Sequence, residues 1–283
     1  MAGQAYEVEV SDPCIVVERE GPIVVITLNR PDRFNALTSP MLKALGATFR
    51  KAGADPDVRV IVMQAEGKAF CSGADAGGLS NAANRSIEET LAEPMPVFTA
   101  RQVGIFKPVI CAINGICAGA GLHFVADSEI VIASPQASFT DTHVNVGQVT
   151  ALEPLGLLQR APMGAVLRMV VLGKAERVTA QRAYELGMVS EIVEPEQLRA
   201  RAMELAQFAA SVSPEALQQS LAAIYAIFDT PLNEAYTKGY ERLVRHRTHP
   251  DANEGPVAFM EKRAPNWAPP NPWKQEPLPW LKD

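Results

Sequence analysis

The sequence predicts an α/β fold followed by a helical C-terminal region. Short apolar runs at residues 60–64, 109–113 and 130–133 have the length and composition of buried strands, and helical patterns lie between them. Strands that alternate with helices are typical of α/β proteins. From about residue 180 onward the pattern is almost wholly helical. The chain has 283 residues, of which 47% are hydrophobic, so it can bury a sizeable core.

Local signals predict the N-terminal elements. Two β-rich runs, residues 15–20 and 23–29, are separated by a Gly-Pro pair, and this arrangement predicts a hairpin. Thr38 or Ser39 can cap a helix that begins with Pro40, because proline is favoured in the first helical turn. We therefore expect the first helix soon after the hairpin.

The C-terminal third predicts helices and then an extended tail. The helical segments are expected at residues 195–211, 214–228, 232–247 and about 255–262. The chain therefore divides into a core of residues 1–205, a helical subdomain of residues 206–263 and a tail of residues 264–283. The tail is rich in proline, which prevents a helix, and it holds all three tryptophans. We expect those rings to pack onto the body or onto a neighbouring subunit, and the alternative is a separate partner-binding motif.

Composition narrows the class of protein. A formal net charge of −6 argues against nucleic-acid binding as the main task. The apolar stretch 109–126 is interrupted by glycines and is too broken to span a membrane. Residues 1–13 lack the features of a signal peptide. The four cysteines form no CxxC pair and no zinc spacing, so they are expected to be free thiols: Cys14, Cys71, Cys111 and Cys117. We expect a cytoplasmic protein without a metal.

Two turns of small residues each follow a predicted strand. One covers residues 69–75 and the other residues 114–121, which open an apolar helix. Small residues let the backbone approach a ligand, and helix N-termini present N–H groups without partners. A pair of such N–H groups is what an oxyanion hole needs. The alternative is that both are simply tight turns in a well-packed fold.

Four ordered motifs resemble those of the crotonase superfamily, which includes the enoyl-CoA hydratases and isomerases. They lie at residues 28–37, 70–75, 112–133 and 254–263, and the resemblance extends from about residue 15 to residue 267. It implies a core of stacked ββα units in a spiral and a C-terminal helical region that forms trimers, often paired into hexamers. It also implies an acyl-CoA thioester as substrate, with coenzyme A as part of the substrate and no separate cofactor.

The resemblance assigns further residues by position. The oxyanion hole would use the backbone N–H groups of Ala74 and Ala120. The positions that match the coenzyme A contacts of the family are Arg33, Phe34, Ala36, Ser72, Ala74, Asp75, Ala76, Phe259 and Lys262. The last two would reach in from the C-terminal helix, from a neighbouring subunit. As alternatives, Arg33 and Lys262 are ordinary surface charges, and Asp75 caps a turn.

The chain departs from the hydratases where those enzymes carry two catalytic glutamates. His123 and His143 stand at the matching positions. An imidazole titrates near neutral pH, so it can act as a base in one step and as an acid in the next. Asp141 lies two residues before His143 and can share its side of a strand, while Glu153 is a less certain second carboxylate. The alternative for His123 is a buried core histidine.

Three functions remain open from the sequence. The favoured hypothesis is a lyase of the enoyl-CoA hydratase/isomerase type that uses histidines as acid and base. The second is a hydrolase that cleaves a carbon–carbon bond in a 1,3-dicarbonyl substrate, because the segment from Phe139 to His143 resembles the strand exit of the oxocamphor-hydrolase branch. The third is a non-catalytic acyl-CoA binding protein, since a fold alone does not specify an activity.

Overall fold

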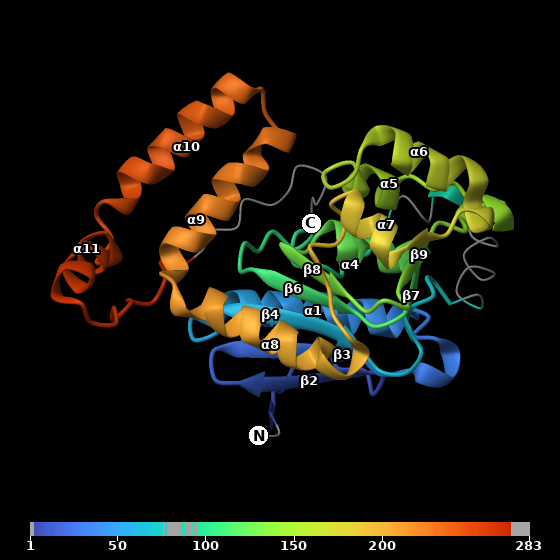
Figure 1. Ribbon diagram of the computed structural model, residues 1–283, viewed down its shortest axis with the longest axis horizontal. Coiled ribbons are helices and arrows are strands. Elements are labelled where there is room, and N and C mark those ends of the chain that lie inside the picture. Colours follow the sequence, from blue (N-terminus) through green and yellow to red (C-terminus); the bar gives the residue numbers. More distant parts are fainter. Residues whose placement is uncertain (1–2, 76, 78–85, 89–91, 93–94, 273–283) are drawn as a thin grey trace.

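The computed structural model describes residues 3–75, 77, 86–88, 92 and 95–272, and within these its strands form two sheets (Figure 1). The larger sheet has the strand order β1 (Gln4–Ala5), β2 (Ile15–Glu20), β3 (Ile23–Leu28), β4 (Val60–Ala65), β6 (Val109–Ile113), β8 (Ile130–Ala133) and β11 (Glu191–Ile192). The smaller sheet has the order β10 (Val178–Thr179), β9 (Ser138–Thr140), β7 (Ile116–Ala118) and β5 (Ala69–Cys71).

Helices connect and cover these sheets. The α-helices are α1 (Ser39–Ala54), α4 (Leu122–Ala126), α5 (Leu152–Leu157), α6 (Met163–Leu172), α7 (Ala180–Glu185), α8 (Pro195–Ser211), α9 (Pro214–Tyr225), α10 (Leu232–His246) and α11 (Asp251–Glu261). Short 3-10 helices lie at η1 (Pro31–Arg33), η2 (Gly119–Gly121), η3 (His143–Val146), η4 (Gly173–Ala175) and η5 (Ala226–Phe228).

The chain alternates between the two sheets, and this alternation builds the stacked ββα core. β4, β6 and β8 are parallel neighbours in the larger sheet, and the strand that follows each of them, β5, β7 and β9, is a parallel neighbour in the smaller sheet. The α/β class and the crotonase-like spiral expected from the sequence are therefore confirmed. The hairpin is also present, as antiparallel β2 and β3.

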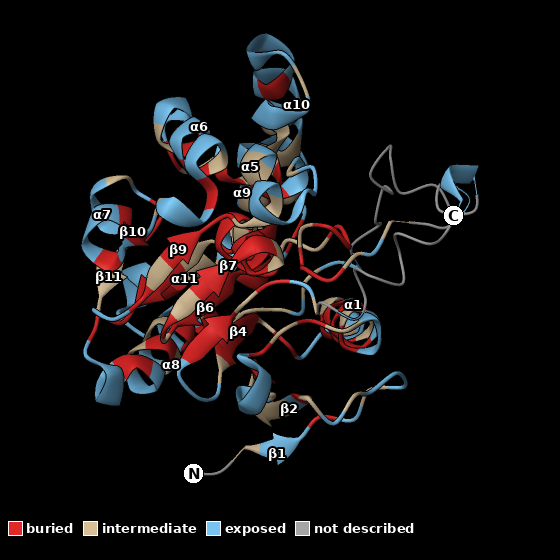
Figure 2. Ribbon diagram, turned by 90° about the vertical axis from the view of Figure 1, so that its right-hand side faces the viewer, coloured by how far each residue is buried: buried red, intermediate tan, exposed pale blue. Residues whose placement is uncertain are grey.

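The larger sheet is buried on both faces. Along β3, Val24 and Ile26 join the apolar cluster that contains α1, whereas Ile23 and Val25 join the cluster that contains α8. This period of two sends successive side chains to opposite faces, so β3 is apolar at nearly every position. Figure 2 shows the buried residues gathered in the strands and on the inward faces of the helices.

The first helix begins at Ser39, one residue earlier than expected, and one of its two expected caps is confirmed. Thr38 caps α1, and its side chain accepts a hydrogen bond from the Met41 N–H. The last helix begins at Asp251 rather than near residue 255, because Pro250 precedes a first turn that carries acidic residues, which favour a helix N-terminus. Residue 205 lies inside α8, which packs on the larger sheet, and the division into three domains stays a prediction.

Helices α9, α10 and α11 extend to one side of the two sheets (Figure 1), and residues 214–261 are called the C-terminal arm below. Tyr225 links the arm to the core, because its hydroxyl donates to Glu129 Oε1 at 2.9 Å. The tail returns to the C-terminal end of α8, where Trp267 Nε1 donates to the Ser211 carbonyl at 2.7 Å. Trp273 and Trp280 lie outside the described residues.

Candidate active site

The first small-residue turn is held by the loop that precedes α1. Leu37 N–H donates to the Gly73 carbonyl at 2.8 Å, and Asp75 N–H donates to the Leu37 carbonyl at 2.9 Å. These bonds form an isolated bridge between Leu37 and Ala74. In such a bridge the N–H of the central residue points away from its partner strand, so the Ala74 N–H faces the other side. Gly73 has φ +105°, a value that side chains rarely allow.

The second turn lies beside the first. Ala120 is the second residue of η2, so its N–H has no partner within that helix. A Cβ placed on Gly119 would lie 3.6 Å from the Gly73 Cα and 3.4 Å from the Cε1 of His143. The structure therefore brings both turns and the His143 ring together.

His143 is bonded to a buried carboxylate. Its Nδ1 lies 2.9 Å from Asp141 Oδ1, and its backbone N–H donates to the same oxygen at 2.9 Å. The Thr150 hydroxyl donates to Asp141 Oδ2 at 2.6 Å. The hydrogen bond that His143 donates to Asp141 outweighs burial and raises the pKa of His143. Burial acts to raise the pKa of Asp141, but the bonds from His143 and Thr150 hold that pKa below its ordinary value.

His123 lies deeper, on α4. Phe98 packs edge-on against its ring with the centroids 5.2 Å apart, and Gln102 Nε2 lies 3.3 Å from its Nδ1. Glu153 of α5 faces both histidines, because its Oε1 lies 3.5 Å from His123 Nε2 and 3.6 Å from His143 Nε2. Burial acts to raise the pKa of Glu153, but its contacts with the two histidines hold that pKa below its ordinary value.

Sequence reasoning found part of this cluster and missed the rest. Asp141 was selected from its spacing to His143, and Glu153 was named only as a less certain carboxylate. Gln102 and Thr150 were missed, since neither belongs to a motif and their contacts depend on how separate segments pack. The one available signal was that Gln102 is a polar side chain in a stretch that becomes buried.

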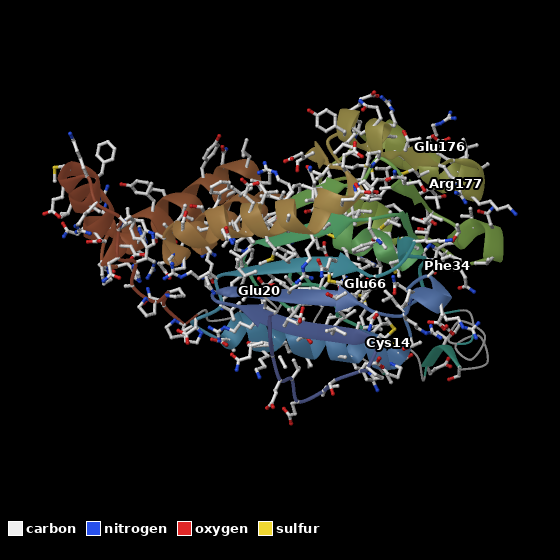
Figure 3. The ribbon with its side chains drawn as sticks, turned by 60° about the horizontal axis from the view of Figure 1, so that its bottom comes forward. Cys14, Glu20, Phe34, Glu66, Glu176 and Arg177 are labelled. Carbon is white, nitrogen blue, oxygen red and sulfur yellow. The ribbon has the colours of Figure 1, made fainter. Side chains whose placement is uncertain are left out.

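The first motif places one set of the expected coenzyme A positions at the surface. Arg33 is exposed at the end of η1, and Phe34 (Figure 3) is 54% exposed with φ +50°. The guanidinium of Arg30, which was not predicted, donates to the Ala36 carbonyl at 3.0 Å and to Asp75 Oδ2 at 2.8 Å. Asp75 is therefore already paired with a cation.

The other expected positions fall into two groups. Ser72 joins the first motif, because its N–H donates to the Phe34 carbonyl at 3.0 Å, while Ala76 lies outside the described residues. Phe259 and Lys262 lie on and just after α11, which is at the opposite end of the long axis from Phe34 (Figures 1 and 3). Within one chain these two residues do not join the motif, so their contact with coenzyme A requires a neighbouring subunit and stays a prediction.

The sequence predicts four free thiols and no metal site. Among the described residues, no three or more His, Cys, Asp or Glu side chains are arranged to hold a metal ion. Burial raises the pKa of Cys71 to about 12 and raises the pKa of Cys111 and Cys117 as well. All four cysteines are free thiols. No helix in the described part of the chain is long and apolar enough to cross a membrane.

Known proteins resemble this chain over most of its length. The profile of the family "Enoyl-CoA hydratase/isomerase" matches residues 18–270. The chain is 32% identical over 247 residues to the mitochondrial enoyl-CoA hydratase domain-containing protein 3 of Rattus norvegicus, which covers 86% of this chain and 80% of the relative. It is 31% identical to the (E)-benzylidenesuccinyl-CoA hydratase of Thauera aromatica, over 89% of this chain and 97% of the relative.

A solved structure supports the same assignment. An enoyl-CoA hydratase/isomerase from Mycobacterium paratuberculosis superposes with a TM-score of 0.85 and 40% identity, over 91% of this chain and 99% of the other. The hydrolase and the non-catalytic binder are not favoured by these comparisons, because the relatives are named as hydratases.

The expected cytoplasmic location is wrong by the same comparisons. Enoyl-CoA hydratase domain-containing protein 3 of rat, mouse and human is in each case a mitochondrial protein. The error has a physical reason. Free thiols indicate a reducing environment, but they do not distinguish one reducing compartment from another. With fold, motifs and relatives in agreement, the chain belongs to the enoyl-CoA hydratase/isomerase family of the crotonase superfamily.

Proposed function

We propose that this protein moves a proton at the carbon next to the carbonyl of an acyl-CoA thioester, with His143 as the acid/base group. The observation that carries the proposal is the position of the His143 ring. Its Nδ1 is bonded to Asp141, and its Cε1 lies against the Gly119 turn. The backbone N–H groups of Ala74 and Ala120 would receive the thioester oxygen.

The hydrogen bond to Asp141 decides which nitrogen of His143 reacts. Because Nδ1–H is donated to the carboxylate, the lone pair of neutral His143 lies on Nε2. Nε2 takes the proton from the carbon, the C–H electron pair becomes the enolate, and the negative charge collects on the thioester oxygen. Two preorganised N–H donors stabilise that charge, and each such donor contributes about 3 kcal/mol.

His143 and the two backbone N–H groups would serve both the double-bond shift and the hydration of an enoyl thioester. Returning the proton to a different carbon shifts the double bond of an enoyl thioester. Adding water across the double bond requires that one proton is removed from the water and that one proton is added at the carbon next to the carbonyl. His143 would transfer one of these two protons. The relatives are named as hydratases of enoyl, dehydroadipyl and benzylidenesuccinyl thioesters, so hydration is the reaction we favour.

Coenzyme A would bind along the first and second motifs. Arg33 offers a cation near the surface, and the loop that carries Ser72 and Asp75 is tied to Phe34 and Arg30 by hydrogen bonds. A preformed loop loses little conformational freedom when the ligand binds. Lys262 would add a phosphate contact from a neighbouring subunit.

We also propose a trimer, or a hexamer made of two trimers. The arm exposes apolar side chains at helical spacing along α10, with Leu232 59%, Tyr236 70%, Tyr240 66% and Leu243 56% exposed. A contiguous row of this kind marks an interface more often than free surface. Light scattering at micromolar concentration should give the mass of a trimer or hexamer, and a monomer would contradict the proposal.

A panel of coenzyme A thioesters tests the function directly. Saturated, α,β-unsaturated and aromatic thioesters are titrated by calorimetry and assayed for hydration and double-bond shift. We expect saturable binding of several thioesters and turnover of at least one. Release of a carboxylic acid from a 1,3-dicarbonyl compound would support the hydrolase instead, and binding without any turnover would support the non-catalytic protein.

A further inference from the structure

One carboxylate lies between the two imidazoles of the site. Glu153 extends from α5, which packs on the helix that carries His123. Its Oε1 is 3.5 Å from the Nε2 of His123 and 3.6 Å from the Nε2 of His143. Its side chain is only 9% exposed. A buried carboxylate is costly unless positive or donor groups face it, so the protonation of the two rings decides what this group does.

Gln102 fixes the tautomer of His123 through the ring nitrogen Nδ1. The Phe98 N–H donates to Gln102 Oε1 at 3.0 Å, so the amide of Gln102 has only one orientation that keeps this bond. Gln102 Nε2 is then the donor that lies 3.3 Å from His123 Nδ1. Nδ1 must accept, and the ring proton sits on Nε2, where it points at Glu153.

His143 has the opposite tautomer. Asp141 also accepts from the His143 backbone N–H and from the Thr150 hydroxyl, so it is an acceptor toward Nδ1. The neutral ring therefore carries its lone pair on Nε2, which faces Glu153 at 3.6 Å. Glu153 thus accepts from His123 and lies next to the nitrogen that would take the substrate proton.

The two rings also differ in access. The His143 side chain is 19% exposed and lies against the Gly119 turn, whereas the His123 side chain is 8% exposed and lies under Phe98. The Cε1 of His143 would lie 3.4 Å from a Cβ placed on Gly119, in one of the turns that would hold the thioester oxygen.

We propose that Glu153 is a positioning residue for His143, that His123 holds Glu153 in place, and that His123 acts through Glu153 rather than on the substrate. The proposal rests on the proposed role of His143 as acid and base. The carboxylate stabilises the imidazolium that forms when Nε2 of His143 takes a proton from the substrate. Nε2 then returns that proton to the substrate, while Glu153 stays ionised between the two rings.

The charges around His143 give the proposal a measurable consequence. Among the described residues, the charged groups that face its ring are Asp141 from its own turn and Glu153 from α5, with His123 of α4 behind Glu153. Both carboxylates raise the pKa of His143. Glu153→Gln keeps an oxygen for His123 and removes one negative charge, so the pKa of His143 should fall while the tautomer of His123 is kept.

The experiment is nitrogen-15 NMR of the imidazoles in the free protein, which needs no substrate. The chain has four histidines, so the spectra can be assigned by single substitutions. We expect wild type to show His123 protonated on Nε2 and neutral His143 protonated on Nδ1. Glu153→Gln should lower the titration midpoint of His143. Gln102→Glu should add a proton at His123 Nδ1 while Nε2 stays protonated, because both ring nitrogens would then face a carboxylate.

Matched variants separate positioning from simple loss of structure. Gln64→Glu changes another buried glutamine, bonded to Thr27 across β3 and β4, and should leave both histidine spectra unchanged. Gln102→Met is a neutral second variant, in case the buried charge prevents folding, and it should leave His123 as a mixture of tautomers. With a thioester that turns over, Glu153→Gln should lower kcat by about 100-fold and change KM little.

The outcomes distinguish this inference from the proposed function. An unchanged His143 midpoint in Glu153→Gln, or a His123 ring protonated on Nδ1 in wild type, would overturn the role given to Glu153 even if thioesters turn over. If the NMR result is as expected but no thioester turns over, the role of Glu153 in positioning His143 is supported and the proposed activity on acyl-CoA thioesters is rejected.

Discussion

Both histidines stand at positions that match catalytic glutamates of the hydratases. The structure surrounds the two rings differently. His143 is the first residue of η3, three residues after β9 ends, with Asp141 on its Nδ1 and the two small-residue turns beside it. His123 lies within α4 with Gln102 on its Nδ1, beneath a phenylalanine ring. A carboxylate stabilises an imidazolium, whereas an amide donor fixes a neutral tautomer.

This difference shows that residue type alone does not assign a role at a catalytic position. The hydrogen-bond partner of Nδ1 determines which ring nitrogen carries the proton. The exposure of the ring determines which histidine can meet the substrate. On both counts we propose His143 as the acid/base group and His123 as a residue that supports it. The following predictions test that asymmetry, from the largest expected effect to the smallest.

His143→Ala should remove most of the turnover of any thioester that the wild type processes. A general base contributes on the order of 100- to 10,000-fold, and the expected loss in kcat lies in that range, with coenzyme A affinity retained. His246→Ala, in the arm, is the matched control and should keep full activity. Equal activity of His143→Ala and wild type would show that His143 is not the acid/base group.

Asp141→Asn should reduce kcat nearly as much, because the neutral amide no longer holds the proton on Nδ1 and no longer stabilises the imidazolium. The pKa of Asp141 is lowered in the folded protein. Its contribution to stability is therefore present above the ordinary carboxyl pKa and is lost as pH falls through the folded value. Denaturant titrations between about pH 5 and pH 2 should show a smaller loss on acidification in Asp141→Asn than in wild type.

The activity of wild type should fall on acidification, because the base is neutral His143. Its pKa is raised, chiefly by Asp141, so the midpoint of kcat/KM should lie above the reference imidazole value of about 6.5. The sign for stability is opposite to that of the carboxylates, since the contribution of His143 is present below the ordinary pKa and lost as pH rises through the folded one. A midpoint below the reference value would remove His143 as the titrating base.

His123→Asn should cost less than His143→Ala, about 100-fold or below, because it displaces Glu153 without removing the acid/base group. The measurement is kcat and KM on the same thioester, with His143→Ala in parallel. If His123→Asn proved the more damaging of the two, the roles assigned to the rings would have to be exchanged.

Lys262→Ala should have the smallest effect. An exposed charge contributes about 0–1 kcal/mol, so coenzyme A affinity should fall by no more than a few-fold, and its dependence on salt should become flatter. Isothermal titration at two ionic strengths measures both quantities. Unchanged affinity at low salt would exclude Lys262 from the coenzyme A site.

Features that depend on neighbouring residues could be predicted from the sequence. Contacts between segments that are distant in the sequence could not. The strands at residues 109–113 and 130–133, the cap at Thr38 and the spacing of Asp141 from His143 follow from periodicity and short-range chemistry. Gln102 could not be found in this way, because its bond to His123 spans 21 residues and depends on packing between a loop and α4.

The most direct test of the account is exchange of the protons next to the carbonyl of butyryl-CoA in heavy water, followed by mass spectrometry. This thioester has no double bond, so exchange reports formation of the enolate alone. Wild type should introduce deuterium at that carbon, and His143→Ala should slow the exchange by on the order of 100-fold or more while it still binds the thioester. Exchange at equal rates in the two proteins, or none with wild type at saturation, would contradict the assignment of His143 as the group that moves the proton.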